Sequence, residues 1–255
     1  MSTRRSLTEI TKNPEFFGQV AGLAMRVTGD LDASEVSALL AEMNSCCGTD
    51  AAVFASLIKE DETFESYRFI LACDPTWCLE YESTASYMND PWLEYTRHHS
   101  EPILAERIVA RTVREKEVVA LAKRFGFTSA IVVPTHSPQG LTRLGALCLG
   151  SEEPDYFDDR TLAAVSFAAT GLAVRLHAWQ IEKLRDELLA RVRFSEFELS
   201  LLSHERNGLR SKEVAALTQS TWQLVDMRWQ RLNAKLGVSS RSAAARIAAE
   251  YGLID

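Results

Sequence analysis

The spacing of apolar residues predicts a series of helices in the first two thirds of the chain. In residues 30–48 apolar side chains recur at helical intervals, at Val36, Leu39, Leu40 and Met43. Asp32 or Ser34 can cap the start of this helix, and Gly48 can end it. Similar patterns predict helices over residues 77–87, from Asp90-Pro91 onward, over 112–125 and over 158–183.

Short uninterrupted apolar runs predict strands between these helices. They cover residues 51–58, 67–73, 129–134 and 141–150. The acidic stretch 59–65 predicts an exposed turn between the first two strands, and residues 137–140 predict a turn between the last two. Because helices precede, separate and follow the strands, we expect an α/β/α sandwich, a sheet with helices on both faces, ending near residue 187.

Residues 188–255 carry helical patterns only. Ser195 and Glu198 have the spacing of a capping box, which predicts a helix from there to about Arg206. Ser211 can cap a short helix, and a polar turn at 218–221 leads into a longer helix over 222–236. Two helices joined by a tight turn, with the second one longer, are typical of a helix-turn-helix. The charged stretch 182–193 is the expected linker before it.

The charge is distributed unevenly between these two parts. The whole chain has a net charge of −7. Residues 188–255 hold ten Lys and Arg against seven Asp and Glu, whereas the first 187 residues hold 18 against 28. An acidic body with a mildly basic C-terminal part is expected when only that part meets phosphates.

Several classes of protein are disfavoured by the sequence. Residues 1–17 have no apolar segment of a secretion signal, and no apolar run approaches the roughly 18 residues needed to cross a bilayer, so we expect a soluble intracellular protein. Five cysteines without CxxC spacing predict reduced thiols and no metal site. The usual catalytic motifs are missing, and a Cys148–His136 nucleophile pair would need a spatial proximity that sequence does not show. We therefore predict that the protein has no catalytic residues.

The C-terminal part resembles the LuxR family of quorum-sensing regulators. The resemblance is carried by Phe194-Ser195-x-x-Glu198, Gly208, Glu213-Val214-Ala215, Val225, Lys235-Leu236-Gly237-Val238 and Tyr251-Gly252-Leu253-Ile254. It implies transcription regulation through DNA binding. Departures from the family pattern are Thr218, Ser220 and Leu224, and also Arg228, Arg231 and Asp226.

The longer helix of the helix-turn-helix has an apolar stripe that packs inward and a polar face that can meet a major groove. The stripe is Val225, Trp229, Leu232 and Leu236. The candidate DNA-binding residues are Gln223, Asp226, Met227, Arg228, Gln230, Arg231, Lys235 and Arg241. The aspartate among them would repel phosphates, which predicts an unusual target site or weak binding. An ordinary solvated helix face is the alternative reading of the same pattern.

The N-terminal part resembles the acyl-homoserine-lactone-binding domain of the same family, through Trp77-x-x-x-Tyr81 and Asp90-Pro91. The resemblance implies that Trp77 donates to a lactone carbonyl, Tyr81 donates to the amide carbonyl and Asp90 accepts from the amide N–H. Read without the family, the two aromatic residues could belong to the core and Asp90 could be a helix cap. No cofactor is expected other than this small-molecule signal.

Three further candidate ligand-binding positions depart from the family pattern. Ala105 stands where most members have a second tryptophan, Ala130 replaces a glycine, and Cys148 stands where some members have a hydroxyl residue. A missing indole predicts a void, because packed interiors leave few gaps. Neighbours such as Trp92 or Tyr95 could fill it, or the pocket could accept a different signal.

The fold class expected from these patterns is α+β, with an N-terminal α/β/α sandwich sensing domain over 1–187 and an all-α four-helix helix-turn-helix domain over 188–255. The function implied is a cytoplasmic, LuxR-type regulator that binds DNA as a homodimer in response to an acyl-homoserine lactone or related signal. The helix over 158–183 and the C-terminal domain would form the dimer. The alternative is a ligand-independent regulator or antagonist that forms heterodimers with a related regulator.

Overall fold

The computed structural model describes residues 5–59, 65–137 and 142–254. The turns predicted at 59–65 and 137–140 lie in large part outside these residues. By their internal contacts the residues form two compact units. The first is Met1–Leu57, Tyr67–Pro138 and Arg143–Trp179, and the second is Ile58–Ser66, Gln139–Thr142 and Gln180–Asp255. The boundary predicted after residue 187 lies inside a helix, Asp159–Arg191, and remains a prediction.

The first unit is built on a five-stranded sheet of order β2-β1-β5-β4-β3. Its strands are β1 (Ala51–Lys59), β2 (Glu65–Ala72), β3 (Ile103–Leu104), β4 (Ser129–His136) and β5 (Leu144–Ser151). The pairs β1–β5, β4–β5 and β3–β4 are antiparallel. Four of these strands match the predicted apolar runs, whereas the two-residue β3 is too short to leave a pattern in the sequence.

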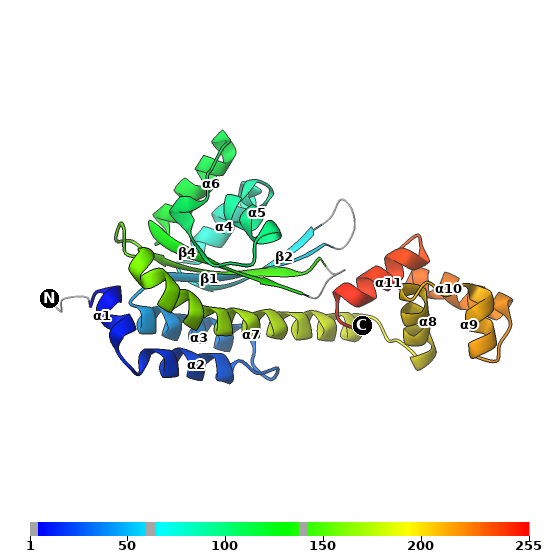
Figure 1. Ribbon diagram of the computed structural model, residues 1–255. Helices are drawn as coiled ribbons and strands as arrows, with labels where there is room; N and C mark the ends of the chain where they lie inside the picture. Colours follow the sequence, from blue (N-terminus) through cyan, green and yellow to red (C-terminus); the bar gives the residue numbers. More distant parts are fainter. Residues whose placement is uncertain (1–4, 60–64, 138–141, 255) are drawn as a thin grey trace. The chain divides into compact units, whose positions relative to one another are not determined.

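Helices cover both faces of this sheet (Figure 1), which confirms the predicted sandwich. One face carries α1 (Leu7–Lys12), α2 (Phe16–Arg26), α3 (Ala33–Cys47) and the first part of α7 (Asp159–Arg191). The other carries α4 (Thr76–Ser83), η1 (Ser86–Asn89), α5 (Pro91–His98), η2 (Ala105–Arg107) and α6 (Val113–Arg124).

Strand residues alternate between the two cores because successive side chains point to opposite faces. Ala52 and Phe54 belong to the cluster under α2, α3 and α7. Val53 and Ala55 belong to the cluster under α4, α5 and α6. Burial on both faces explains why the strands read as continuous apolar runs rather than as an alternation.

The predicted capping of α3 is confirmed. The Asp32 carboxylate accepts from the backbone amides of Ser34 and Glu35, and Gly48 ends the helix with a φ of 64°. That left-handed conformation suits glycine, which has no Cβ to clash with the backbone. Neither α1 nor α2 was expected from the sequence, although α2 buries one face through Phe16, Val20 and Leu23.

The prediction of a linker over residues 182–193 is wrong for most of that stretch, because α7 continues to Arg191. Its last turns are amphipathic, with Leu184 and Leu188 buried at a spacing of one turn. Among the described residues α7 is the one helix with the length and apolar composition to cross a membrane. This is weak evidence for a span, since Val165, Leu172 and Leu176 of α7 are buried in the core that covers the sheet.

The second unit contains four short helices after α7. They are α8 (Glu196–Arg206), α9 (Ser211–Leu217), α10 (Trp222–Leu236) and α11 (Arg241–Glu250). The capping box of Ser195 and Glu198 is present, and Gly237 ends α10 with a φ of 71°. The inward stripe of α10 is buried at Val225, Trp229 and Leu232, so the predicted all-α C-terminal fold is confirmed.

Candidate functional site

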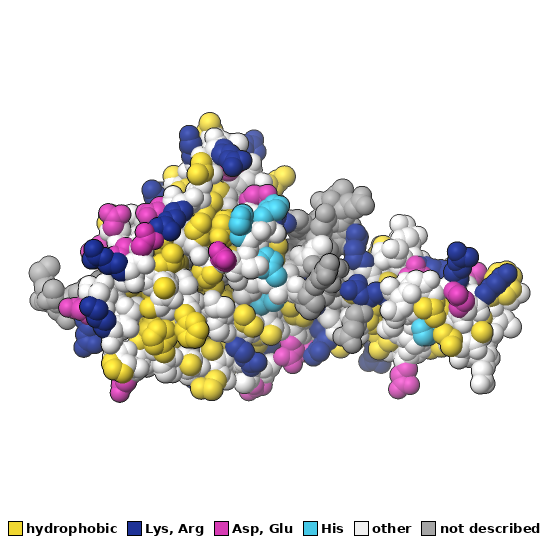
Figure 2. Space-filling model, in the orientation of Figure 1, with side chains coloured by type: hydrophobic (Ala, Val, Ile, Leu, Met, Phe, Trp, Pro, Cys, Tyr) yellow, Lys and Arg dark blue, Asp and Glu magenta, His cyan; other side chains and the backbone are white. Residues whose placement is uncertain are grey.

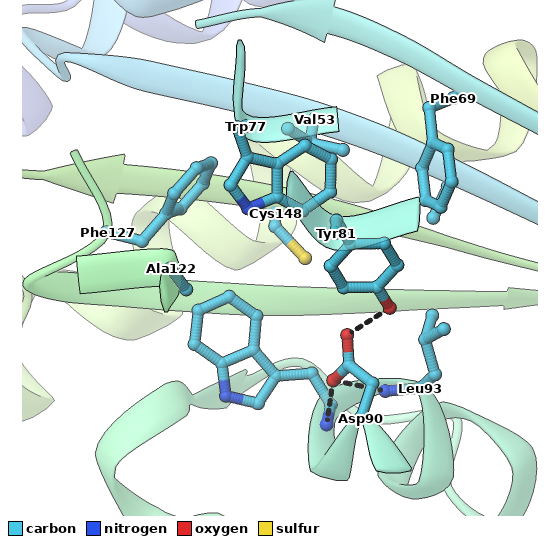
Figure 3. A pocket seen from close by; sticks show the side chains of 11 residues that line it. Val53, Phe69, Trp77, Tyr81, Asp90, Leu93, Ala122, Phe127 and Cys148 are labelled. Carbon is cyan, nitrogen blue, oxygen red and sulfur yellow. Dashed lines mark hydrogen bonds between the residues drawn. The ribbon is translucent and has the colours of Figure 1, made fainter. Parts of the chain in front are cut away.

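A small cavity lies between the sheet and the helices α4, α5 and α6 of the first unit (Figure 3). Its lining is mostly apolar and aromatic, and consists of Val53, Ala55, Phe69, Trp77, Tyr81, Asp90, Trp92, Leu93, Ala122, Phe127 and Cys148. A second cavity shares Trp77, Tyr81, Asp90, Trp92 and Ala122 with the first and adds Val118 and Val119 of α6. An apolar cavity with a few polar groups is the usual form of a small-molecule site.

Asp90 is held by the start of α5, where it has the capping role that the sequence also allowed. Its Oδ1 accepts from the backbone amides of Trp92 at 2.8 Å and Leu93 at 3.3 Å. Its Oδ2 accepts from the Tyr81 hydroxyl at 2.6 Å, and Figure 3 shows the phenol pointing at this carboxylate. Asp90 is therefore both a cap and a wall of the cavity, so the two readings of this residue are compatible.

Burial shapes the ionisation of this pair. It raises the pKa of Asp90, while the hydrogen bonds from Tyr81 and the two backbone amides oppose that rise. Burial and the nearby Asp90 carboxylate raise the pKa of Tyr81 well above its ordinary value. Tyr81 thus stays a phenol and a donor. The predicted bond from Tyr81 to a ligand carbonyl would require its hydroxyl to leave Asp90.

Trp77 is held in the cavity wall by aromatic packing. Its ring stacks on Tyr81 at 4.7 Å between centroids and meets Phe69 edge to face at 5.6 Å. Its indole N–H is buried and finds no acceptor among the described residues. A buried donor without a partner costs about 1–3 kcal/mol, so a ligand oxygen that accepts from this N–H would remove that cost.

The other predicted ligand-binding residues separate into two groups. Cys148 lines the first cavity, where burial raises the pKa of its thiol. Ala105 and Ala130 are buried in the same apolar cluster and line neither cavity. Trp92, which the sequence suggested as a replacement for a missing indole, lines both cavities. Tyr95 instead donates to the backbone carbonyl of Glu101 and stacks on His99.

The two cavities have volumes of about 30 and 20 Å³, and the void predicted at Ala105 remains a prediction. Such volumes hold about one water molecule each. Phe69 and Leu93 were missed as lining residues, because a pattern of apolar residues does not tell which core side chains border a cavity.

The structure also separates the histidine and cysteine of the nucleophile pair considered above. His136 pairs with Leu144 across the β4–β5 ladder, and Cys148 lies four residues further along β5. Strand geometry places that position roughly 13 Å away. The His136 ring bonds instead to the backbone carbonyl of Thr96 at 2.6 Å.

The polar face of α10 is divided between residues used inside the domain and residues that point to solvent. Gln223, Met227, Gln230 and Arg231 are exposed. Lys235 forms an ion pair with Glu198 at 2.9 Å, and Arg228 lies over the Phe197 ring. The exposed group, together with Arg228, forms the solvent-facing side of α10.

Asp226 does not project freely from this surface. Its Oδ1 accepts from Ser211 Oγ and from Arg241 Nη2, both at 2.8 Å, and Arg241 also donates to Ser211 at 2.6 Å. The bonds from Ser211 and Arg241 lower the pKa of Asp226, so the carboxylate is ionised. This cluster ties three helices together, and the negative charge of Asp226, a candidate DNA-binding residue in the sequence, is paired.

Comparison with known proteins agrees with this geometry. The model of the autoinducer binding domain family matches residues 32–179. No curated protein matches the chain. Among solved structures, SdiA in complex with octanoyl-rac-glycerol is 16% identical with a TM-score of 0.71, covering 95% of this chain and 98% of SdiA. Escherichia coli SdiA in another structure is 18% identical with a TM-score of 0.72, covering 93% and 98%.

A third similar structure is CepR2 from Burkholderia cenocepacia, described as an N-acylhomoserine-lactone-dependent LuxR family transcription factor. It is 13% identical with a TM-score of 0.53, covering 64% of this chain and 93% of CepR2. At these identities the structures share the fold. Because the family model covers more than half of the chain, the protein belongs to the autoinducer binding domain family.

Proposed function

We propose that this protein is a cytoplasmic transcription regulator that binds an acylated small signal in the α4–α6 cavity and binds DNA as a homodimer through α10. The observation that carries the proposal is the convergence of Trp77, Tyr81 and Asp90 on one apolar cavity. They provide an unpaired donor, a phenol and a carboxylate beside apolar walls. That set suits a ligand with a polar head that carries carbonyl oxygens and an apolar tail.

Two similar structures indicate which signals to test. CepR2 is described as dependent on N-acylhomoserine lactones, and SdiA was solved with octanoyl-rac-glycerol. Both ligand types combine carbonyl oxygens with an acyl chain. A cavity of about 30 Å³ is far too small for either, so binding must displace side chains and open the cluster under α4, α5 and α6.

Thermal melting with a panel of N-acyl homoserine lactones and monoacylglycerols tests the proposed function. A ligand at about 100 times its Kd adds about 2.7 kcal/mol to the free energy of unfolding, which should raise the Tm by roughly 5–10 °C. Free fatty acids of the same chain lengths control for unspecific binding of the tail. A flat response to both panels would exclude this class of signal.

The proposed dimer rests on an exposed apolar face formed by α2 and α7. Figure 2 shows hydrophobic side chains gathered over these two helices. Phe167 and Met25 are 78% and 73% exposed, and an open groove of about 660 Å³ runs beside them between α2 and α7. Gly171 lies in this groove with open space beside its Cα. A protruding ring beside an open groove is the kind of surface that two copies can share across a two-fold axis.

Replacing Phe167 by serine should weaken the dimer. In a two-fold interface the substitution acts twice, and loss of roughly 1–2 kcal/mol per ring raises the dissociation constant at least about tenfold. Sedimentation velocity over a range of concentrations measures this change. Leu79→Ser is the matched control, because Leu79 is 67% exposed on α4 at the opposite face of the sheet. Equal dissociation constants for wild type and Phe167→Ser would refute this interface.

The contacts of three residues support direct DNA binding better than the alternative of a heterodimerising antagonist. It was suggested by Thr218, Ser220 and Asp226, which depart from the family pattern. The Thr218 hydroxyl donates to the Val214 carbonyl at 2.8 Å and lies 3.0 Å from that of Ser220. Asp226 is paired with Arg241. Since these three residues have partners within their own domain, direct DNA binding remains the function that we propose.

A further inference from the structure

Two indole N–H groups, and not one, are buried without a partner at the candidate site. Trp77 and Trp92 are 7% and 8% exposed. Neither Nε1 has an acceptor among the described residues. Buried donors almost always find a partner, so two orphans at one place call for an explanation. For Trp77 the resemblance to the family supplies an explanation, a hydrogen bond to the ligand. For Trp92 it supplies none.

Both tryptophans border the same space. Each lines the first cavity, of about 30 Å³, and the second, of about 20 Å³. The shared wall between the two cavities is completed by Tyr81, Asp90 and Ala122. A ligand that merges the two cavities would therefore contact both indoles.

Within the part of the chain that the structure describes, no acceptor pairs with either indole N–H. Asp90 is the carboxylate of both cavities, and its oxygens already accept from Tyr81 and from the backbone amides of Trp92 and Leu93. Tyr81 is a donor in this pair. The site thus has an excess of donors over acceptors, and the ligand must supply the missing acceptors.

Trp92 is held firmly enough to serve as a positioned donor. It occupies the first turn of α5 directly after Pro91, and its backbone amide donates to Asp90 at 2.8 Å. Its ring meets Phe127 edge to face at 6.1 Å between centroids. An indole whose backbone and ring are both held in this way loses little further freedom when it binds a ligand, which favours a specific hydrogen bond.

We propose that Trp92 is a second signal-binding donor, and that the signal carries two separate acceptor oxygens in its polar part, one for each indole. This inference rests on the proposed function of the cavity. Two acceptors beside an acyl chain occur in an N-acyl homoserine lactone, through its lactone and amide carbonyls. They also occur in a monoacylglycerol, through its ester carbonyl and hydroxyl oxygens.

The test compares Trp92→Phe with wild type in the full-length protein, using N-octanoyl homoserine lactone and octanoylglycerol as separate probes. Phenylalanine keeps an aromatic ring and removes only the N–H donor and the pyrrole part. We expect the Kd of the probe that binds wild type to rise about tenfold, as for the loss of one hydrogen bond. Whichever probe binds shows whether the two acceptor oxygens belong to a homoserine lactone or to a monoacylglycerol.

Trp179→Phe is the matched control. Trp179 is equally buried, but its Nε1 donates to the Leu31 carbonyl at 3.2 Å, away from the cavities. Its replacement should lower the Tm and leave the Kd unchanged. Trp92→Phe should raise the Kd, and it should lower the Tm less than Trp179→Phe does, because both variants lose the same part of the ring but only Trp179→Phe also loses a hydrogen bond of the unliganded fold. A merely structural role of Trp92 would lower the Tm without changing the Kd.

A measurement on wild type avoids dependence on the variant. Five tryptophans give five indole N–H signals in a ¹⁵N-labelled sample. On addition of the bound probe, the signals of Trp77 and Trp92 should move downfield, and that of the exposed Trp222 should stay. If a probe binds and only the Trp77 signal moves, the inference is overturned while the proposed function stands. If neither probe binds, both are overturned.

Discussion

Replacing Asp90 by alanine is expected to abolish the response to signal and to lower the stability of the sensing domain. The substitution removes the cap of α5, which costs about 0.5–2 kcal/mol. It also leaves the buried Tyr81 hydroxyl without its acceptor, at a cost of about 1–3 kcal/mol. The carboxylate offered to a ligand N–H is lost as well. Thermal melting with and without the active signal measures all three effects.

Asp74→Ala is the matched control for this experiment. The Asp74 carboxylate accepts from the backbone amide of Thr76 at 2.9 Å, at the start of α4, and it lines neither cavity. Its loss should cost about 1 kcal/mol and preserve the signal-dependent rise in Tm. A normal response to signal from Asp90→Ala would mean that the ligand assignment is wrong.

Replacing Arg241 by alanine is expected to lower the affinity for DNA by roughly 10- to 100-fold at low salt. The variant loses a cation near the DNA-facing surface and exposes the Asp226 carboxylate, which Arg241 now pairs at 2.8 Å. The freed negative charge would then repel phosphates. Fluorescence anisotropy with a random-sequence duplex measures this affinity without knowledge of the target site.

The double variant Asp226→Ala with Arg241→Ala separates the two causes. If repulsion by the freed carboxylate dominates, the double variant should recover most of the affinity lost in Arg241→Ala, and Asp226→Ala alone should bind at least as well as wild type. Arg26→Ala controls for the loss of a positive charge, because Arg26 pairs with Glu42 in the sensing domain. No recovery in the double variant would show that Asp226 has no influence on DNA binding.

Local sequence patterns predicted the structure correctly where it depends on residues that are close together in the chain. The capping of α3 by Asp32, the start of α5 after Asp90 and the end of α10 at Gly237 are all visible as short motifs. A cap depends on residues within three positions of each other, so one turn of sequence contains the necessary information. The resemblance of Trp77, Tyr81 and Asp90 to a family motif likewise pointed to the region in which a cavity lies.

Predictions failed where a segment takes its structure from distant partners. Residues 182–191 looked like a charged linker, yet they continue α7 with Leu184 and Leu188 buried. The strand β3 has two residues and exists only because Ile103 and Leu104 pair with β4. Packing and pairing of this kind are tertiary effects that override weak local preferences.

By itself the sequence determined most of the secondary elements after residue 30, the all-helical character of the C-terminal part and the resemblance to the family, because apolar period, caps and motif spacing are local properties of a chain. Only the tertiary structure decided how the chemistry is arranged. It placed the Tyr81 hydroxyl on Asp90, paired Asp226 with Arg241, and brought Trp92 beside Trp77 at one cavity. Each of these depends on which side chains meet across separate elements, and a hydrogen bond or ion pair forms only between atoms that the fold brings within about 3 Å of each other.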